Sequence, residues 1–139
     1  MNEINITATT EIKIPFFDID PLEVVWHGHY AKYFEIARGD LMDKVNYNIL
    51  QMRDSGYAWP IIDLRIKYIK PAIYQQTIQI ETCLMEYYNR LKVHYLVTDL
   101  KTGEKLTKAE STQVAVNLKT QEMCFISPSI LFEKLGIKI

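Results

Sequence analysis

Two kinds of hydrophobic periodicity divide this chain. Between Tyr30 and Val45, apolar side chains recur at steps of three and four residues, which is typical of an amphipathic helix. Elsewhere apolar and polar residues alternate, as in a strand with one buried face. Aromatic residues at helical spacing are usually core, so we expect this stripe to be buried. It consists of Tyr30, Tyr33, Phe34, Ala37, Leu41 and Val45.

The alternating pattern occurs once before the helix and repeatedly after it. It is cleanest in Ile62, Leu64, Ile66 and Tyr68, whose neighbours are charged, and this predicts one buried and one polar face. A later strand changes its apolar phase from Cys83 onward, which predicts a bulge. The predicted strands cover residues 6–15, 59–70, 76–87, 91–99, 105–118 and 123–126.

Short breaks separate these elements. Asn46-Tyr47-Asn48 interrupts the long helix, and a short helix over 49–55 is expected to end at Gly56. A C-terminal helix is predicted between a Ser127 cap and Gly136. Tight turns join the later strands, so the order predicts an antiparallel sheet folded around one central helix. The fold class is therefore α+β.

Length and composition limit the possible functions. The 139 residues fit a single domain, 1–139, and 16 basic against 17 acidic side chains argue against a nucleic-acid partner. Cys83 and Cys124 are too far apart for a CxxC site, and we expect both to be buried and inert in a reducing cytoplasm. There is no signal peptide pattern and no membrane-spanning apolar run, so we expect a cytoplasmic protein with no membrane partner.

Candidate chemistry is concentrated between Phe16 and Arg38. Asp20 is followed by Pro21 and precedes the apolar pair Val24-Val25, so partial loss of solvent would favour a general base there. Aspartates near proline also commonly cap turns, and this alternative stays open for both Asp18 and Asp20. Asp18 suits the capping role better.

Other side chains in this segment have both structural and chemical interpretations. His27 and His29 flank Gly28, and only one is expected to enter a site. A two-residue step with no third histidine does not predict a metal centre, and a histidine bonded to backbone at the helix start is the alternative. Glu35 would be a catalytic candidate if it faced a pocket, but an i,i+3 ion pair with Arg38 explains it. Phosphate-loop, dinucleotide, G-x-S-x-G and H-E-x-x-H motifs are absent, so no cofactor is predicted.

The combined pattern resembles a known family. An aromatic-x-Asp-x-Asp run, then Val-Val-aromatic-His-x-x-Tyr and Tyr-Phe-Glu-x-Ala-Arg, fills residues 16–38. In motif and spacing it resembles the hotdog-fold thioesterases, in the 4-hydroxybenzoyl-CoA and short-chain acyl-CoA thioesterase branch. Residues 55–72 further resemble thioesterase-like proteins of bacterial aryl-polyene lipid biosynthesis.

The resemblance implies a hotdog fold and hydrolysis of an acyl thioester of CoA or acyl-carrier protein. It places the catalytic carboxylate at Asp20, an assisting residue at His27 and a structural role at Asp18, with His29 pointing outward. The active site would lie between subunits of a homodimer or homotetramer, the opposite chain supplying oxyanion donors. The expected donors are the peptides of Ala58 and Trp59, and Trp26 and Tyr30 are expected to line the acyl pocket.

One departure from the family pattern concerns substrate choice. Many relatives carry small residues, often glycine, where this chain has Leu22-Glu23, so the loop is bulkier here. Two other functions remain as alternatives. One is a non-catalytic module that binds acyl-CoA or acyl carriers, and the other is a hotdog dehydratase of 3-hydroxyacyl carriers.

Overall fold

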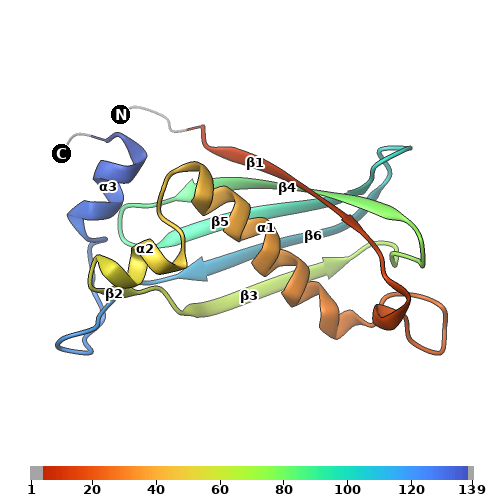
Figure 1. Ribbon diagram of the computed structural model, residues 1–139, viewed down its shortest axis with the longest axis horizontal. Helices are drawn as coiled ribbons and strands as arrows, with labels where there is room; N and C mark the ends of the chain where they lie inside the picture. Colours follow the sequence, from red (N-terminus) through yellow and green to blue (C-terminus); the bar gives the residue numbers. More distant parts are fainter. Residues whose placement is uncertain (1–4, 138–139) are drawn as a thin grey trace.

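One long helix lies across an antiparallel sheet of five strands (Figure 1). The computed structural model describes residues 5–137. The sheet contains β1 (Thr7–Lys13), β3 (Ile61–Tyr68), β4 (Thr77–Glu86), β5 (Leu91–Asp99) and β6 (Lys105–Gln113), in the order β1-β4-β5-β6-β3. β2 (Tyr57–Ala58) and β7 (Val116–Asn117) form a separate pair. The helices are α1 (Tyr30–Lys44), α2 (Ile49–Asp54) and α3 (Ser129–Leu135). The predicted α+β architecture is confirmed.

The core lies between α1 and the inner face of the sheet. The predicted helical stripe is buried from Tyr30 to Leu41, and Val45 packs half-buried at its end. Ile80 and Val97, which pair across β4 and β5, face it with no exposed surface. Each large apolar side chain buried in this way contributes about 1.5 to 3 kcal/mol. Within the described part of the chain, no helix is both long and apolar enough to cross a membrane.

The predicted breaks are mostly confirmed. Asn48 caps α2 in a capping box with Gln51, and Gly56 follows the helix with φ of 94°. Gly136 ends α3 in the left-handed conformation. The predicted Ser127 cap is wrong: Pro128 occupies the cap position, and the Ser127 hydroxyl donates instead to the carbonyl of Tyr87.

Three strand predictions need correction. The bulge exists, but the register shifts around Met85 rather than at Cys83, because Thr82 and Leu84 continue the buried phase. The predicted strand over 105–118 is divided into β6 and β7. Residues 123–126 contribute only an isolated bridge from Met123 to Val116.

The predicted buried face of β3 is largely exposed in the single chain. Ile62 is 59% and Tyr68 47% exposed, although their alternation with charged residues is clean. β3 is an edge strand. α1 packs mainly over β1 and β4, which lie at the opposite edge of the sheet. Alternation identifies a face that can be buried, but not the element that covers it.

Candidate active site

The connection between β1 and α1 contains a small hairpin. The Asp20 N–H donates to the Val24 carbonyl at 2.9 Å, and the Glu23 N–H donates to the Asp20 carbonyl at 2.9 Å. Glu23 has φ of 66°, a left-handed conformation that favours glycine and closes a three-residue hairpin loop. This conformation gives a physical reason for glycine at the position where the resemblance expects it. Leu22 is exposed at the tip.

Asp20 lies at the start of this hairpin loop. Its Oδ1 accepts the Leu22 N–H at 2.8 Å, and the residue is half-buried. The Asp20 carboxylate therefore caps its own turn, which is one of the two roles that the sequence left open for it. No hydrogen bond from residues 5–137 is found at its other oxygen, which leaves that oxygen available to a reacting molecule.

Asp18 has a different environment, because it is almost fully buried. Lys32 Nζ lies 2.9 Å from both carboxylate oxygens, and the Tyr33 hydroxyl donates to Oδ2 at 2.5 Å. Burial alone would raise the pKa of Asp18, but the hydrogen bonds from Tyr33 and Lys32 outweigh it and hold the pKa below 3.8. Burial and this same contact raise the pKa of Tyr33. Asp18 thus stays ionised and ties the loop to the first turns of α1.

The two histidines form one short 3-10 turn, His27–His29, directly before α1. The indole of Trp26 lies against both imidazoles, with ring centroids 5.3 Å apart in each pair. His29 is half-buried, and its Nδ1 lies 3.7 Å from Asp18 Oδ1. The expected outward orientation of His29 is therefore wrong. His27 is the more exposed of the two.

The two residues expected to line an acyl pocket differ in exposure. Trp26 is 47% exposed and available to a ligand. Tyr30 is 1% exposed, and its hydroxyl accepts the Ala72 N–H at 3.1 Å. Tyr30 therefore belongs to the core of the single chain rather than to an open pocket.

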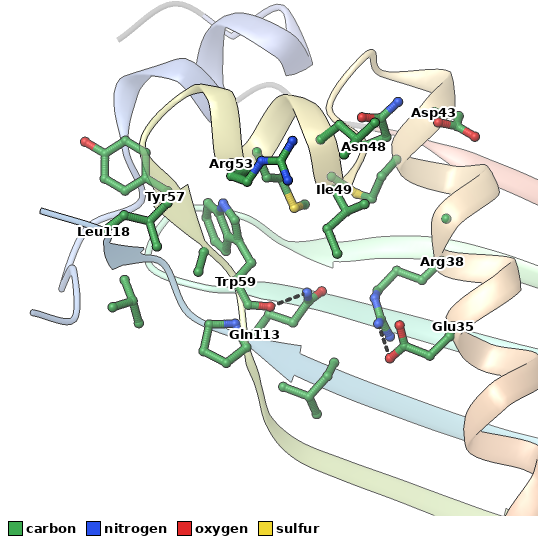
Figure 2. Close-up of a pocket in the computed structure, with 18 residues that line it drawn as sticks. Glu35, Arg38, Asp43, Asn48, Ile49, Arg53, Tyr57, Trp59, Gln113 and Leu118 are labelled. Atoms are coloured by element: carbon green, nitrogen blue, oxygen red, sulfur yellow. Dashed lines mark hydrogen bonds and ion pairs between the residues drawn. The ribbon is translucent and has the colours of Figure 1, made fainter. Parts of the chain in front are cut away.

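A cavity of about 940 Å³ lies between α1, α2, β2 and the start of β3 (Figure 2). Ala58 and Trp59, the expected oxyanion donors, form part of its wall. The Trp59 indole is buried and donates to the Tyr47 hydroxyl at 3.2 Å, which fixes this turn. Most of the lining is apolar and includes Met42, Ile49, Leu50, Met52, Pro60 and Ile61.

Polar side chains also line this cavity, among them Arg38, Glu35 and Gln113. Arg38 is buried, forms the expected ion pair with Glu35, and donates to the Tyr95 hydroxyl at 3.2 Å. Burial would lower the pKa of Arg38, but Tyr95 and Glu35 hold it above its usual value. Gln113 donates through Nε2 to the Trp59 carbonyl at 2.7 Å. Our sequence reasoning missed Gln113, although a glutamine in phase with the inward residues of β6 is a detectable signal.

The candidate residues form two separate groups in the single chain. Asp20, Trp26 and His27 lie at the N-terminal end of α1, whereas Ala58 and Trp59 lie beyond its C-terminal end beside α2 (Figure 1). A helix of 15 residues is about 22 Å long at 1.5 Å per residue. One chain therefore does not bring the two groups together. No cluster of three metal-ligating side chains is found among residues 5–137.

Comparison with known proteins defines the class. Residues 14–132 match the thioesterase-like superfamily, and the chain belongs to that family. The helix and sheet described above are those of the hotdog fold, and the family match together with the named relatives supports thioester hydrolysis as the activity.

Individual relatives carry more specific names. The candidate acyl-CoA thioesterase YneP of Bacillus subtilis is 26% identical over 107 residues, which cover 77% of this chain and 78% of YneP. The long-chain acyl-CoA thioesterase FadM of Escherichia coli is 25% identical over 114 residues, covering 81% and 86%. Among solved structures, a DHNA-CoA thioesterase from Staphylococcus aureus superposes with a TM-score of 0.79 at 26% identity, covering 86% of this chain and 80% of that one.

Proposed function

We propose that this protein hydrolyses acyl thioesters of CoA or acyl-carrier protein, with Asp20 as the reacting carboxylate. The observation that carries this assignment is the contrast between the two loop aspartates. Asp18 is buried and held by Lys32 and Tyr33, whereas Asp20 keeps one oxygen free of hydrogen bonds from residues 5–137. Of the two, only Asp20 can approach a substrate.

Two chemical routes are compatible with this geometry. Asp20 either attacks the thioester carbonyl, forming an anhydride that water then cleaves, or removes a proton from water as the water attacks. Both routes add one water and release a carboxylic acid and a free thiol. The Trp59 N–H is the oxyanion donor, because Ala58 is paired with Val116 in the β2–β7 ladder, and a donor of this kind is typically worth about 3 kcal/mol. His27 assists from the turn before α1.

The site is completed by a second copy of the chain. Because the length of α1 separates Asp20 from Ala58 and Trp59, each catalytic centre combines the hairpin loop of one chain with the cavity of its partner. Apolar side chains left exposed on both regions supply the contact surface. These side chains are Phe16, Phe17 and Leu22 on the loop segment, and Ile62 and Leu64 on β3. The assembly is a homodimer or a homotetramer built from such dimers.

The test is release of free thiol from a panel of acyl-CoA and acyl-carrier-protein thioesters. Asp20→Asn should keep fold and assembly, by circular dichroism and light scattering, yet lose hydrolysis by several orders of magnitude. Glu11→Gln is the matched control, because it neutralises an exposed carboxylate on β1. Wild-type turnover by Asp20→Asn would rule out this mechanism. Tight binding without thiol release would indicate a binding module, and loss of water from 3-hydroxyacyl thioesters would indicate a dehydratase.

A further inference from the structure

Three lysines gather on the outer face of the sheet, which is the face turned away from the core. Lys67 on β3 pairs in register with Lys108 on β6, so the two side chains leave the sheet opposite each other, with Cβ atoms about 5 Å apart. Both are exposed, and like charges in this position destabilise a sheet. Lys105 lies on the same face as Lys108, because the register of β5 and β6 shifts between Val97 and Thr98. These three residues form the lysine cluster.

The lysine cluster lacks acidic partners. Among residues 5–137, none of its three ammonium groups forms an ion pair. Glu110, the nearest carboxylate along β6, already lies 3.7 Å from Lys92 and 3.1 Å from His94. Asp63 is taken by Arg65, at 3.0 Å. The charge of the cluster is therefore left for a partner to neutralise.

A hollow of about 510 Å³ lies over the lysine cluster. All three lysines line it, and Glu81 on β4 lines it on the side away from β3. Half-buried Ile66 and Leu96 contribute apolar surface between these charges. Of the lining carboxylates, Glu81 is the one without an ion pair in the described chain. The hollow thus keeps an excess of positive charge, and such a surface attracts an acidic partner.

The residue types favour a broad acidic surface over a single phosphate group. Arginine binds phosphate through two parallel hydrogen bonds, whereas lysine offers a flexible point charge. The arginine of the hollow, Arg65, is held by Asp63. Its tyrosine, Tyr95, is 2% exposed and cannot stack on a nucleotide base. A second copy of the chain does not suit this face either, because a twofold contact centred here would set the lysine cluster against itself.

The lysine cluster lies behind the part of β3 that touches the candidate site. Successive strand residues point to opposite faces, so Tyr68, next to Lys67, faces the core side of the sheet. The Tyr68 hydroxyl donates to the His27 carbonyl at 3.3 Å. The segment after β3 continues to the hairpin, where the Val25 N–H donates to the Ala72 carbonyl at 2.9 Å (Figure 1). A flexible arm anchored over the cluster therefore reaches the hairpin loop by passing round the end of β3.

We propose that the lysine cluster docks the acidic surface of a carrier protein, which delivers the acyl group in preference to CoA. This inference rests on the proposed thioesterase function and names the partner that presents its substrate. The docked carrier neutralises the unpaired ammonium groups, and its phosphopantetheine arm brings the thioester round the end of β3 to Asp20. Contacts between exposed charges act mainly on the association rate and weaken as salt is added.

The test measures thiol release from one acyl group presented on CoA and on a bacterial acyl-carrier protein. Lys108→Glu reverses one charge of the cluster. Lys13→Glu is the matched control, because Lys13 is exposed on β1, at the opposite edge of the same sheet. We expect Lys108→Glu to lower kcat/KM for the carrier-protein ester by about tenfold, mainly through KM, and to leave the CoA ester unchanged. Lys13→Glu should change neither, and added salt should slow the wild type only with the carrier-protein ester.

Two kinetic outcomes would overturn the proposal: an equal loss for both esters in Lys108→Glu, or a loss confined to the CoA ester. A changed assembly state of this variant by light scattering would also overturn it, because the face would then be a contact between copies of the chain. Urea unfolding checks the fold. Removing one of two opposed like charges should leave stability unchanged or raise it.

A binding measurement separates this inference from the proposed function. The carrier protein that bears the phosphopantetheine arm but no acyl group is titrated into the Asp20→Asn protein by calorimetry. A dissociation constant that rises about tenfold when Lys108→Glu is added, but not when Lys13→Glu is added, supports docking even if the wild type releases no thiol. Equal constants in all three proteins, or no measurable binding, contradict it even if CoA esters are hydrolysed.

Discussion

The indole of Trp26 occupies the space that a side chain at residue 28 would need. A Cβ built on Gly28 would come within 2.3 Å of the Trp26 ring, well inside van der Waals contact. The backbone at residue 28 belongs to a 3-10 turn that any residue adopts, so glycine here gives space to the Trp26 ring rather than a special conformation. This contact sets the position of Trp26 between His27 and His29.

Gly28→Ala should therefore displace the Trp26 ring and reduce activity while the fold is retained. We expect kcat/KM to fall at least tenfold, since a displacement of about 1 Å in a catalytic constellation can cost that much or more. Steady-state kinetics and the tryptophan emission spectrum measure the two effects. Gly39→Ala is the stability control, because a Cβ there meets nothing within 4 Å and should stabilise α1 by up to about 1 kcal/mol. An unchanged emission spectrum and rate for Gly28→Ala would contradict this role of the contact.

The Asp18 carboxylate should make stability depend on pH in the acid range. Its folded pKa lies below the ordinary value of 3.8, so its contribution is fully present above about pH 3.8 and is lost as pH falls through the lower folded pKa. Asp18→Asn should lower the free energy of unfolding at neutral pH by about 1 to 3 kcal/mol, because Tyr33 loses a charged acceptor. Urea unfolding at neutral pH and below pH 3.8 measures both changes. A variant that weakens as steeply as the wild type in acid would show that Asp18 is not the titrating group.

Glu23 is held in a backbone conformation that suits glycine. Glu23→Gly should raise the free energy of unfolding by about 1 kcal/mol, since a non-glycine residue in the left-handed region carries a cost of this size. The comparison variant is Gln121→Gly, which relieves a similar φ of 60° in the turn after β7, outside the hairpin loop. Both should gain stability, but only Glu23→Gly should change relative rates across acyl groups of different size. Equal substrate profiles in both variants would show that this loop does not affect selection.

Mixed assemblies should reveal whether each site is shared between chains. Asp20→Asn removes the carboxylate, and Ala58→Phe fills the cavity at the other end of α1, so each variant alone should be inactive. Random mixing of the two should restore about a quarter of wild-type activity, because each hybrid dimer regains one intact site. The measurement is thiol release after unfolding and refolding the two proteins together. No recovery in hybrids verified by mass spectrometry would place the complete site within one chain.

The sequence predicted local features well because their causes are local. The stripe from Tyr30 to Leu41, the helix break before Ile49 and the Glu35–Arg38 pair each depend on residues a few positions apart, and the structure contains all of them. Contacts between segments that are distant in the chain could not be predicted in this way. The strand pattern of β3 gave no sign that α1 would leave it uncovered.

The same distinction applies to the candidate site. From their spacing, Asp18 and Asp20 look like two similar turn residues. In the folded chain Lys32 and Tyr33 bind Asp18 and make it a buried anchor, and the Asp20 carboxylate stays available. His29 contacts Asp18 for a similar reason: the loop folds back onto the start of α1. The hydrogen bond that holds Gln113 goes to the Trp59 carbonyl, which lies 54 positions away in the chain, so local sequence patterns do not reveal it.

The anchoring of Asp18 also has a consequence for local opening. Its carboxylate bonds to two side chains of α1, and its carbonyl accepts the Trp26 N–H at 3.1 Å, so the loop cannot detach from the helix without breaking all of these contacts. We expect loop and helix to form one cooperative unit in hydrogen exchange, with amides of residues 18–25 exchanging as slowly as those early in α1. In Asp18→Asn that unit should divide, and the loop should exchange fast while the helix stays protected.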